Sequence, residues 1–363
     1  MKFLLIVFTA VIGMVCPPVL RAADLMAIYQ EALTQDAQYR SARAAHQASQ
    51  EKMVQGRAGF LPSITLSASR TVQQVDANNI FVTGIGTVNP QEVTIQSRGV
   101  TISATQPIFR MENIVIYQQS KIEVSRADAQ FIVAAQDLIL RVAQAYFDVL
   151  DAQIDVEVAE AQKKAILLQL EQAKRNFEVG TATIVDTNEA QARHDLTLSL
   201  EIAALNALEI RKRALQGIID RFPGMLAGAK EIASNLSNLR YGSMDEWVKV
   251  AEEQNFTLKI QKAAYEMAQQ DVKRAGALHY PTVDLVAQYS DQTGVGGAIT
   301  GRGIDLVSKS IGIQLNVPLF QGFSVQSRVR EALALQERAL NDLETTRRTI
   351  TLQIRQQFLN VTN

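Results

Sequence analysis

The side chains that could carry chemistry in this chain are few and lie far apart. None of the three histidines, His46, His194 and His279, stands at a metal-ligand spacing from a carboxylate, and the neighbours His194 and Asp195 form a pair of the kind usually found at a surface. The glycine-rich stretch "GVGGAITGRG" lacks the Lys-Ser/Thr and the helix start of a phosphate-binding loop. No nucleophile elbow or zinc motif occurs. The sequence therefore predicts no enzyme, no cofactor and no metal site.

The charge balance of the chain indicates which partners it can bind, and the residues at its N-terminus indicate its cellular compartment. The 363 residues hold 36 Lys and Arg against 37 Asp and Glu, a formal charge of −1, so no basic excess favours nucleic acid as a partner. Residues 1–23 read as a secretory signal peptide, because Lys2 precedes the apolar run FLLIVFTAVIGMV, and Ala22 and Ala23 supply small residues for cleavage. A retained membrane anchor is the alternative. The only cysteine, Cys16, lies in this segment, so the mature chain is expected to lack thiols and disulfides.

The sequence repeats itself. "GFLPSITLSAS" and "LHYPTVDLVAQYS" align at an offset of 219 residues, which sets Pro62 beside Pro281. Further along, "TQPIF" corresponds to "NVPLF", and "VAQAYFDV" corresponds to "IRQQFLNV". Four matched landmarks in the same order indicate an internal duplication. We therefore divide the chain into a signal peptide and three further segments: a first repeat at 24–222, a linker at 223–242 and a second repeat at 243–363.

Each repeat reads as helix, strand, loop, strand and helix. A helix is expected over residues 24–58, and a shorter amphipathic one over 242–255. Both strand pairs alternate apolar and polar residues, as in Ile311, Ile313 and Leu315 with Gly312 and Gln314 between them. Period two predicts strands with one apolar and one polar face, and about ten residues suit a transmembrane β-strand.

The loops inside the strand pairs, 75–91 and 290–305, are long and rich in Gly, Asn and Thr, as on the outer side of membrane barrels. A soluble sandwich is the alternative, and four strands placed between very long helices fit it poorly. An open four-stranded sheet leaves backbone groups unsatisfied in lipid. The sequence thus favours several chains that each contribute four strands to one barrel.

A long helical hairpin is the other large element. From 110 to 177 the chain holds no proline and no glycine, and about 68 residues at ~1.5 Å each span roughly 100 Å. Apolar residues on both arms recur at coiled-coil spacing. The arms meet at Val179, Gly180 and Thr181, and apolar residues also follow the turn. By itself, this stretch is equally typical of a soluble coiled-coil hairpin.

Taken together, the ordered landmarks resemble the TolC-type outer-membrane efflux and secretion channels. They include "AYFDVLDAQ", "FEVGTATIVDTNEAQA" and "NVPLFQG" besides the duplicated segments. The resemblance implies an α+β membrane protein, a homotrimer with a twelve-stranded β-barrel in the outer-membrane lipid and a long α-helical barrel in the periplasm. It also implies a passive conduit that exports drugs or polypeptides with a periplasmic adaptor and an inner-membrane pump of the RND or ABC type.

The resemblance also assigns roles to residues near the turn. Val179, Gly180 and Thr181 match the family's adaptor-docking tip, whereas Asp186 and Gln169 match members of the network that keeps the entrance shut. Two simpler interpretations stay open: Gly180 caps a helix, and Asp186 is an ordinary charge at a helix N-terminus.

The match is incomplete in two respects. Val185 stands where the family has a hydroxyl-bearing residue. The second repeat reaches Asn363 without a tip hairpin of its own, so we expect a C-terminally truncated form. The competing function is a periplasmic coiled-coil adaptor without channel activity, although adaptors usually show one hairpin nested in β-domains.

Overall fold

The computed structural model describes residues 23–75, 80–82, 86–88, 93–228, 243–295 and 304–362. The predicted signal peptide therefore lies outside the described residues except for Ala23, and so does most of the predicted linker. Two compact units are formed, one from the described residues up to Ser41 together with those of 134–238, the other from the described residues of 42–133 and 239–363. Both sequence repeats contribute to the second unit, so the units are not the repeats themselves.

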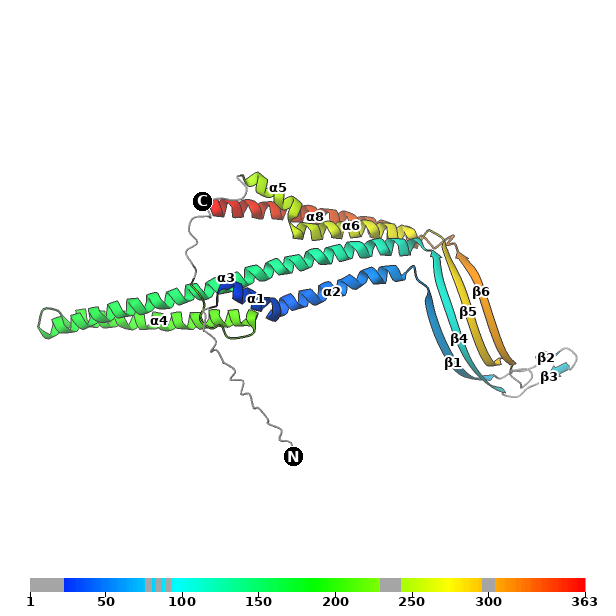
Figure 1. Cartoon of the computed structure of the whole chain (residues 1–363), viewed down its shortest axis with the longest axis horizontal. Coiled ribbons are helices and arrows are strands. Elements are labelled where there is room, and N and C mark those ends of the chain that lie inside the picture. The colour runs from blue at the N-terminus through cyan, green and yellow to red at the C-terminus, as the bar shows by residue number, and fades with distance from the viewer. Residues whose placement is uncertain are drawn as a thin grey trace, which may run out of the picture. The chain divides into compact units, whose positions relative to one another are not determined.

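The elements follow the predicted order (Figure 1). Seven helices and six strands are found in the described part of the chain: α1 (Leu25–Gln35), α2 (Ala37–Ala58), β1 (Ser63–Val75), β2 (Ile80–Val82), β3 (Gly86–Val88), β4 (Val93–Phe109), α3 (Met111–Glu178), α4 (Ile184–Ile219), α5 (Met244–Gln254), α6 (Phe256–Ala277), β5 (Thr282–Val295), β6 (Ile304–Asn316) and α8 (Ser324–Thr362).

The duplication is visible in the geometry. The helices α1 and α5 both have 11 residues, and α2 and α6 both have 22. The joint between the two helices of each pair is alike: Asp36 has ψ 119° and Asn255 has ψ 123°, and the N–H of each donates to the carbonyl four residues earlier. The internal duplication predicted from the sequence is therefore confirmed.

This joint corrects the prediction of one helix over 24–58. The Asp36 backbone is extended and interrupts the helix, while its side chain accepts a hydrogen bond of 2.6 Å from the Tyr39 N–H. Asp36 is buried and also accepts two hydrogen bonds from Arg141, at 3.0 and 3.1 Å. Arg141 lies 105 positions further along the chain, so a local reading of the sequence gives no sign of it.

The core of the first unit lies where α1, α3 and α4 meet. Its buried residues are Ile28 and Ala32 of α1, Leu138, Val142, Tyr146 and Val149 of α3, and Leu215 and Ile219 of α4. Ion pairs hold α4 along α3: the Lys163 Nζ lies 2.6 Å from the Glu201 Oε2, and the Arg211 Nη1 lies 3.1 Å from the Asp148 Oδ2. The 68-residue α3 confirms the long unbroken helix.

The second unit carries one antiparallel sheet in the order β1-β4-β5-β6. Each repeat supplies one hairpin of this sheet, and β4 and β5 join the two hairpins edge to edge. At the end of the sheet nearest the helices, Arg110 donates two hydrogen bonds to Asp284, at 2.8 and 2.7 Å. The strand β5 and the start of α3 are thereby held together across the repeats.

The strands run further than the sequence indicated. The predicted loop 290–305 is strand as far as Val295 and again from Ile304, and part of the loop 75–91 forms the small hairpin of β2 and β3. Residues 76–79, 83–85 and 89–91 of the first loop and 296–303 of the second lie outside the described residues. In the described part of the chain, no helix is both long and apolar enough to cross a membrane.

The Asp36–Arg141 pair yields a prediction about stability. Hydrogen bonding from Arg141 holds the pKa of Asp36 below its ordinary value. A carboxylate whose pKa is lower in the folded than in the unfolded chain stabilises the fold fully above its unfolded pKa, about 3.9, and loses this contribution as the pH falls through the folded value. Asp36→Asn should therefore lower the free energy of unfolding by about 1.5–3 kcal/mol at pH 7.

Circular dichroism during chemical denaturation measures this difference. Asparagine can still cap α2, as Asn255 caps α6, so the loss reports the pairing with Arg141. The difference between wild type and variant should shrink below about pH 4. Asp137→Asn, which removes the more exposed partner of Arg141, is the control and should cost less than ~1 kcal/mol. Equal effects of both variants, or a gap independent of pH, would contradict the assignment.

Candidate functional site

The turn between α3 and α4 is built as a helix cap. Gly180 has φ +77°, the left-handed region that suits glycine. Its N–H donates to the Phe177 carbonyl at 3.0 Å, and the Thr181 N–H donates to the Asn176 carbonyl at 2.8 Å. These are the two bonds of a Schellman motif, which satisfies the last carbonyls of α3. The simpler interpretation of Gly180 as a cap is therefore correct, and it leaves open what the apolar neighbours do.

The first turn of α4 is closed by a capping box. The Thr183 Oγ1 accepts a hydrogen bond from the Asp186 N–H at 3.3 Å, and the Asp186 Oδ2 accepts one from the Thr183 N–H at 2.7 Å. The bond from the Thr183 backbone lowers the pKa of Asp186, followed by the bond from the Thr183 hydroxyl. Asp186 is thus a helix-capping carboxylate and stays ionised at neutral pH.

Large apolar side chains surround this turn without contributing to its hydrogen bonds. Val179 is 73% exposed and Val185 is 67% exposed, and Ile184 is exposed as well. A Cβ added at Gly180 would meet no atom within 4 Å. The tip is therefore an open apolar surface on a turn whose backbone is held by capping hydrogen bonds. Such a surface is costly in water unless another molecule covers it.

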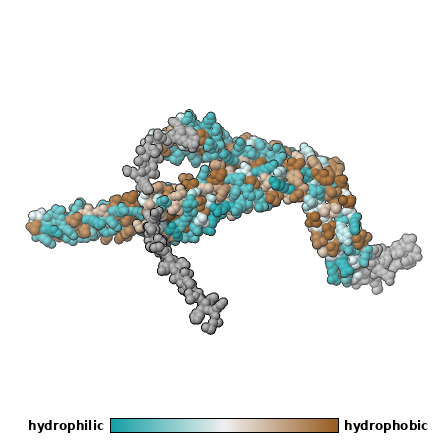
Figure 2. Space-filling model, in the orientation of Figure 1, coloured by the Kyte–Doolittle hydropathy of each residue, from teal (hydrophilic) through white to brown (hydrophobic). Residues whose placement is uncertain are grey.

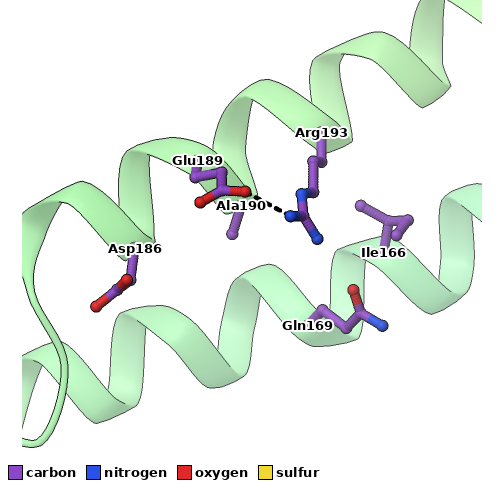
Figure 3. A pocket seen from close by; sticks show the side chains of 6 residues that line it. All are labelled: Ile166, Gln169, Asp186, Glu189, Ala190 and Arg193. Carbon is purple, nitrogen blue, oxygen red and sulfur yellow. Dashed lines mark hydrogen bonds and ion pairs between the residues drawn. The ribbon is translucent and has the colours of Figure 1, made fainter.

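A shallow groove runs between α3 and α4 just behind the tip (Figure 3). The structure brings the two predicted gate residues together here: Gln169 lines the groove from α3 and Asp186 lines it from α4. The other lining residues are Ile166, Glu189, Ala190 and Arg193. Glu189 and Arg193 form an ion pair that the sequence analysis did not single out, although their spacing of four residues on a helix was a usable signal.

The sheet forms a second functional surface, because its register places like residues side by side. One face is apolar, as in the row Leu66, Ile102 and Tyr289. Its apolar residues are Ile64, Leu66, Ala68 and Val72 of β1, Val100, Ile102 and Ala104 of β4, Val283, Leu285, Ala287 and Tyr289 of β5, and Val307, Ile311, Ile313 and Leu315 of β6. The same face also carries the charged residues Arg70, Arg98, Asp291 and Lys309, in the half of the sheet farther from the helices. Figure 2 shows hydrophobic residues gathered over the strands.

The opposite face of the sheet is small and polar. It carries Ser, Thr and Gln almost throughout, as in the row Ser67, Thr101 and Ser290, where the hydroxyl oxygens of Thr101 and Ser290 lie 3.3 Å apart. Within the sheet, β1 and β6 each pair on one side only. A sheet with one apolar face, one polar face and two free edges is suited to lipid on one side and water on the other, once the edges are joined.

These features define a class of protein: a protomer that contributes strands to a membrane barrel and a long helical hairpin to a helical tube. The chain belongs to the outer membrane efflux protein family, whose model matches residues 28–220 and 247–363. TolC of Vibrio cholerae is 30% identical over 343 residues, which cover 94% of this chain and 75% of that protein. The alkaline protease secretion protein AprF of Pseudomonas aeruginosa is 28% identical, over 93% of this chain and 69% of its own length.

Solved structures show the same fold. One is CusC, whose crystal structures concern the conformational changes that accompany folding and transmembrane channel formation. Its match covers 92% of this chain and 75% of CusC, with a TM-score of 0.71 and 15% identity. VceC, an outer-membrane protein of Vibrio cholerae, gives a TM-score of 0.69 at 19% identity, over 90% of this chain and 75% of its own. The CmeC outer-membrane channel of Campylobacter jejuni gives a TM-score of 0.71 at 14% identity, over 90% of this chain and 68% of its own.

Family membership confirms several predictions. The protein is an outer-membrane channel component for efflux or type I secretion, with a helical barrel and a β-barrel, and it extends into the periplasm. It is not an enzyme, because the family consists of channels. The periplasmic adaptor alternative is not favoured. The repeat boundaries and the roles of Val179, Gly180, Thr181, Gln169 and Asp186 stay predictions.

The two faces of the sheet should respond oppositely to the same change. Leu66→Arg places a charge in the apolar face and should cost about 2–4 kcal/mol if the residue lies near the membrane midplane. The neighbouring Ser67→Arg places the charge on the polar face and should be tolerated. The measurement is the amount of heat-resistant oligomer in the outer-membrane fraction. If Ser67→Arg abolished the oligomer and Leu66→Arg did not, the assignment of the faces would be wrong.

Proposed function

We propose that this protein is a passive conduit that three copies build together, and that it works with a periplasmic adaptor and an inner-membrane pump. The observation that carries the proposal is the sheet: its polar face needs water, its apolar face suits lipid, and its two edges need partners. Three copies of four strands make a barrel of twelve. Two copies would make eight strands, a barrel with an interior that side chains fill, whereas twelve leave room for a water-filled lumen.

The helical hairpin is suited to a tube that several copies build together. Many apolar side chains stay exposed along both arms in the single chain, among them Leu140, Leu168 and Ile202. An exposed apolar residue every few turns is what a helix retains for packing against neighbouring helices. Copies placed side by side would bury these residues and leave the charged faces to water.

The tip is proposed as the surface that the adaptor binds. Val179, Ile184 and Val185 are exposed around the capped turn at Gly180 and Thr181, and no function inside the chain accounts for them. An apolar turn of this shape suits the groove of a partner's helical hairpin. The partner pump is proposed to be of the RND or the ABC type. Secretion by an ABC-type pump is supported by the relatives named for protease secretion, AprF and PrtF of Dickeya chrysanthemi.

Gln169 and Asp186 are proposed to act at the entrance of the tube. They line one groove behind the tip, and the bonds from Thr183 keep Asp186 ionised as a hydrogen-bond acceptor. An ionised carboxylate near the end of the hairpin can accept hydrogen bonds from donors on an adjacent copy and thereby hold neighbouring tips together. Breaking those bonds would let the tips separate.

Gly180→Trp tests the docking role. The new side chain meets nothing inside the chain, so the hairpin should fold with a local strain of about 1–2 kcal/mol from the left-handed backbone. The bulk should nevertheless block the adaptor. We expect wild-type amounts of outer-membrane oligomer and ion conductance in planar bilayers, but loss of adaptor co-purification and drug sensitivity equal to that of a deletion strain.

Gly180→Asn is the matched control, because asparagine tolerates the left-handed backbone and is small. It should retain adaptor binding and export. Wild-type drug susceptibility of the Gly180→Trp strain would end the docking proposal. Absence of conductance from the wild-type oligomer would end the conduit proposal instead, so the two failures are distinguishable.

A further inference from the structure

Two arginines stand side by side on the apolar face of the sheet. Arg70 of β1 and Arg98 of β4 are direct cross-strand partners. They line a shallow groove together with Asp291 and Thr293 of β5, and we call this the arginine groove. The proposed conduit turns this face toward lipid and gives the charged side chains no role.

The arginine groove lies in the half of the apolar face that is farther from the helices. The helices adjoin the sheet at Ser63 and Phe109, and Arg70 follows Ile64 by six residues, about 20 Å along a strand. At a strand tilt of about 40° this is roughly 15 Å of height, against an apolar band about 25 Å tall. The family's helical part extends into the periplasm, so the groove lies on the side of the outer leaflet.

The charges of the two arginines are not balanced within the described part of the chain. Both side chains are exposed, and among the described residues no carboxylate forms an ion pair with either. Lys309, a third cation of this face, differs because its Nζ lies 5.8 Å from the centre of the Tyr289 ring. Like charges directly opposite each other destabilise a sheet, and an unpaired cation is costly in lipid. An anion from outside the chain would remove both costs.

The other residues of the groove specify the chemistry of that anion. Adjacent guanidinium groups match a phosphate, because each can donate two parallel hydrogen bonds to its oxygens. The Asp291 carboxylate would repel a second phosphate but accepts hydrogen bonds from hydroxyl groups, and the Thr293 hydroxyl can donate or accept. Val72 and Val100 lie on the same face and are 60% and 43% exposed, which suits acyl chains. A phosphate, neighbouring hydroxyls and acyl chains together describe a phosphorylated glycolipid.

We propose that the arginine groove is a binding site for a phosphorylated glycolipid of the outer leaflet. Arg70 and Arg98 hold one phosphate between them, Asp291 and Thr293 bind hydroxyls of the sugar, and the acyl chains lie along the apolar side chains of the strands. The inference rests on the placement of the apolar face in lipid, which is part of the proposed function. Bound lipid would stabilise the assembled barrel, because the site needs the folded sheet.

Diphosphoryl lipid A is the probe, added to the oligomer after its native lipid has been removed in detergent. Native mass spectrometry measures the bound lipid, and electrophoresis after heating measures the temperature at which the oligomer dissociates. Lipid A should bind saturably and raise that temperature for the wild type. Arg70→Gln combined with Arg98→Gln should weaken binding at least about tenfold and abolish the rise. Without lipid, this variant should be at least as heat-resistant as the wild type, because the repulsion between the arginines is gone.

Matched controls separate this site from general attraction between charges. Arg338→Gln combined with Arg348→Gln removes two cations from α8, where both side chains are 76% exposed, and should bind lipid A as the wild type does. Phosphatidylglycerol, which lacks the sugar, should bind more weakly than lipid A, and an excess of inorganic phosphate should not displace lipid A. Arg98→Gln alone is a second variant of the site and should also weaken binding.

Any of four results would overturn the proposal. The first is equal binding of lipid A by the wild type and by the variants of Arg70 and Arg98, and the second is an equal loss of binding in the α8 variant. The third is equal affinity for phosphatidylglycerol, and the fourth is displacement of lipid A by inorganic phosphate. An oligomer that binds lipid A at this groove but conducts no ions would contradict the conduit alone, so the two failures are distinguishable.

Discussion

The need to satisfy the unpaired backbone N–H and C=O groups at the two edges of the sheet constrains this protein more than any other interaction. The strands β1 and β6 each have one neighbour in the chain, and the apolar face of the sheet belongs in lipid. Lipid offers no partner for the free N–H and C=O groups of an edge strand, and each unsatisfied group costs several kcal/mol. In a single chain the sheet therefore lacks hydrogen-bond partners at both edges, and association with further copies supplies partners for both edges at once.

The remainder of the molecule agrees with that constraint. The polar face of the sheet, with its Ser, Thr and Gln side chains, suits the inside of a shared barrel, and its small side chains keep the lumen open. The long hairpin has its fully buried core around Ile28, Tyr146 and Leu215, and it exposes many apolar residues along its arms. Both parts gain stability from neighbouring copies. At the turn, the caps at Gly180 and Thr183 satisfy backbone groups at the end of α3 and the start of α4 from within the chain.

Local patterns in the sequence were enough to predict the large elements. The absence of proline and glycine predicted α3 within about one residue at each end, and the period of two predicted the four main strands and their faces. The prolines at 62 and 281 marked the end of the helices, and the repeat offset predicted that α5 and α6 would resemble α1 and α2. These features depend on residues close together in the chain or on a comparison of the chain with itself.

Features that depend on distant residues could not be predicted in this way. The break at Asp36 is held by Arg141, and the pairing of β4 with β5 and the Arg110–Asp284 bond connect separate repeats. The capping role of Asp186 was foreseen only as the simpler alternative, and the ion pair of Glu189 and Arg193 was missed.

Disulfide cross-linking across the free edges tests the central claim most directly. In a chain with Cys16→Ser, Ser67→Cys on β1 is combined in turn with cysteine at Ser308, Ser310, Gly312 or Gln314 on β6. Within one chain β1 and β6 are separated by three interstrand spacings, about 14 Å, which is beyond the reach of a disulfide. Every disulfide that forms must therefore join two copies. A closed barrel of three copies predicts, for at least one pair, a ladder of dimer and trimer that stops at the trimer. Monomer alone for all four pairs, or a ladder that continues beyond three, would contradict the account.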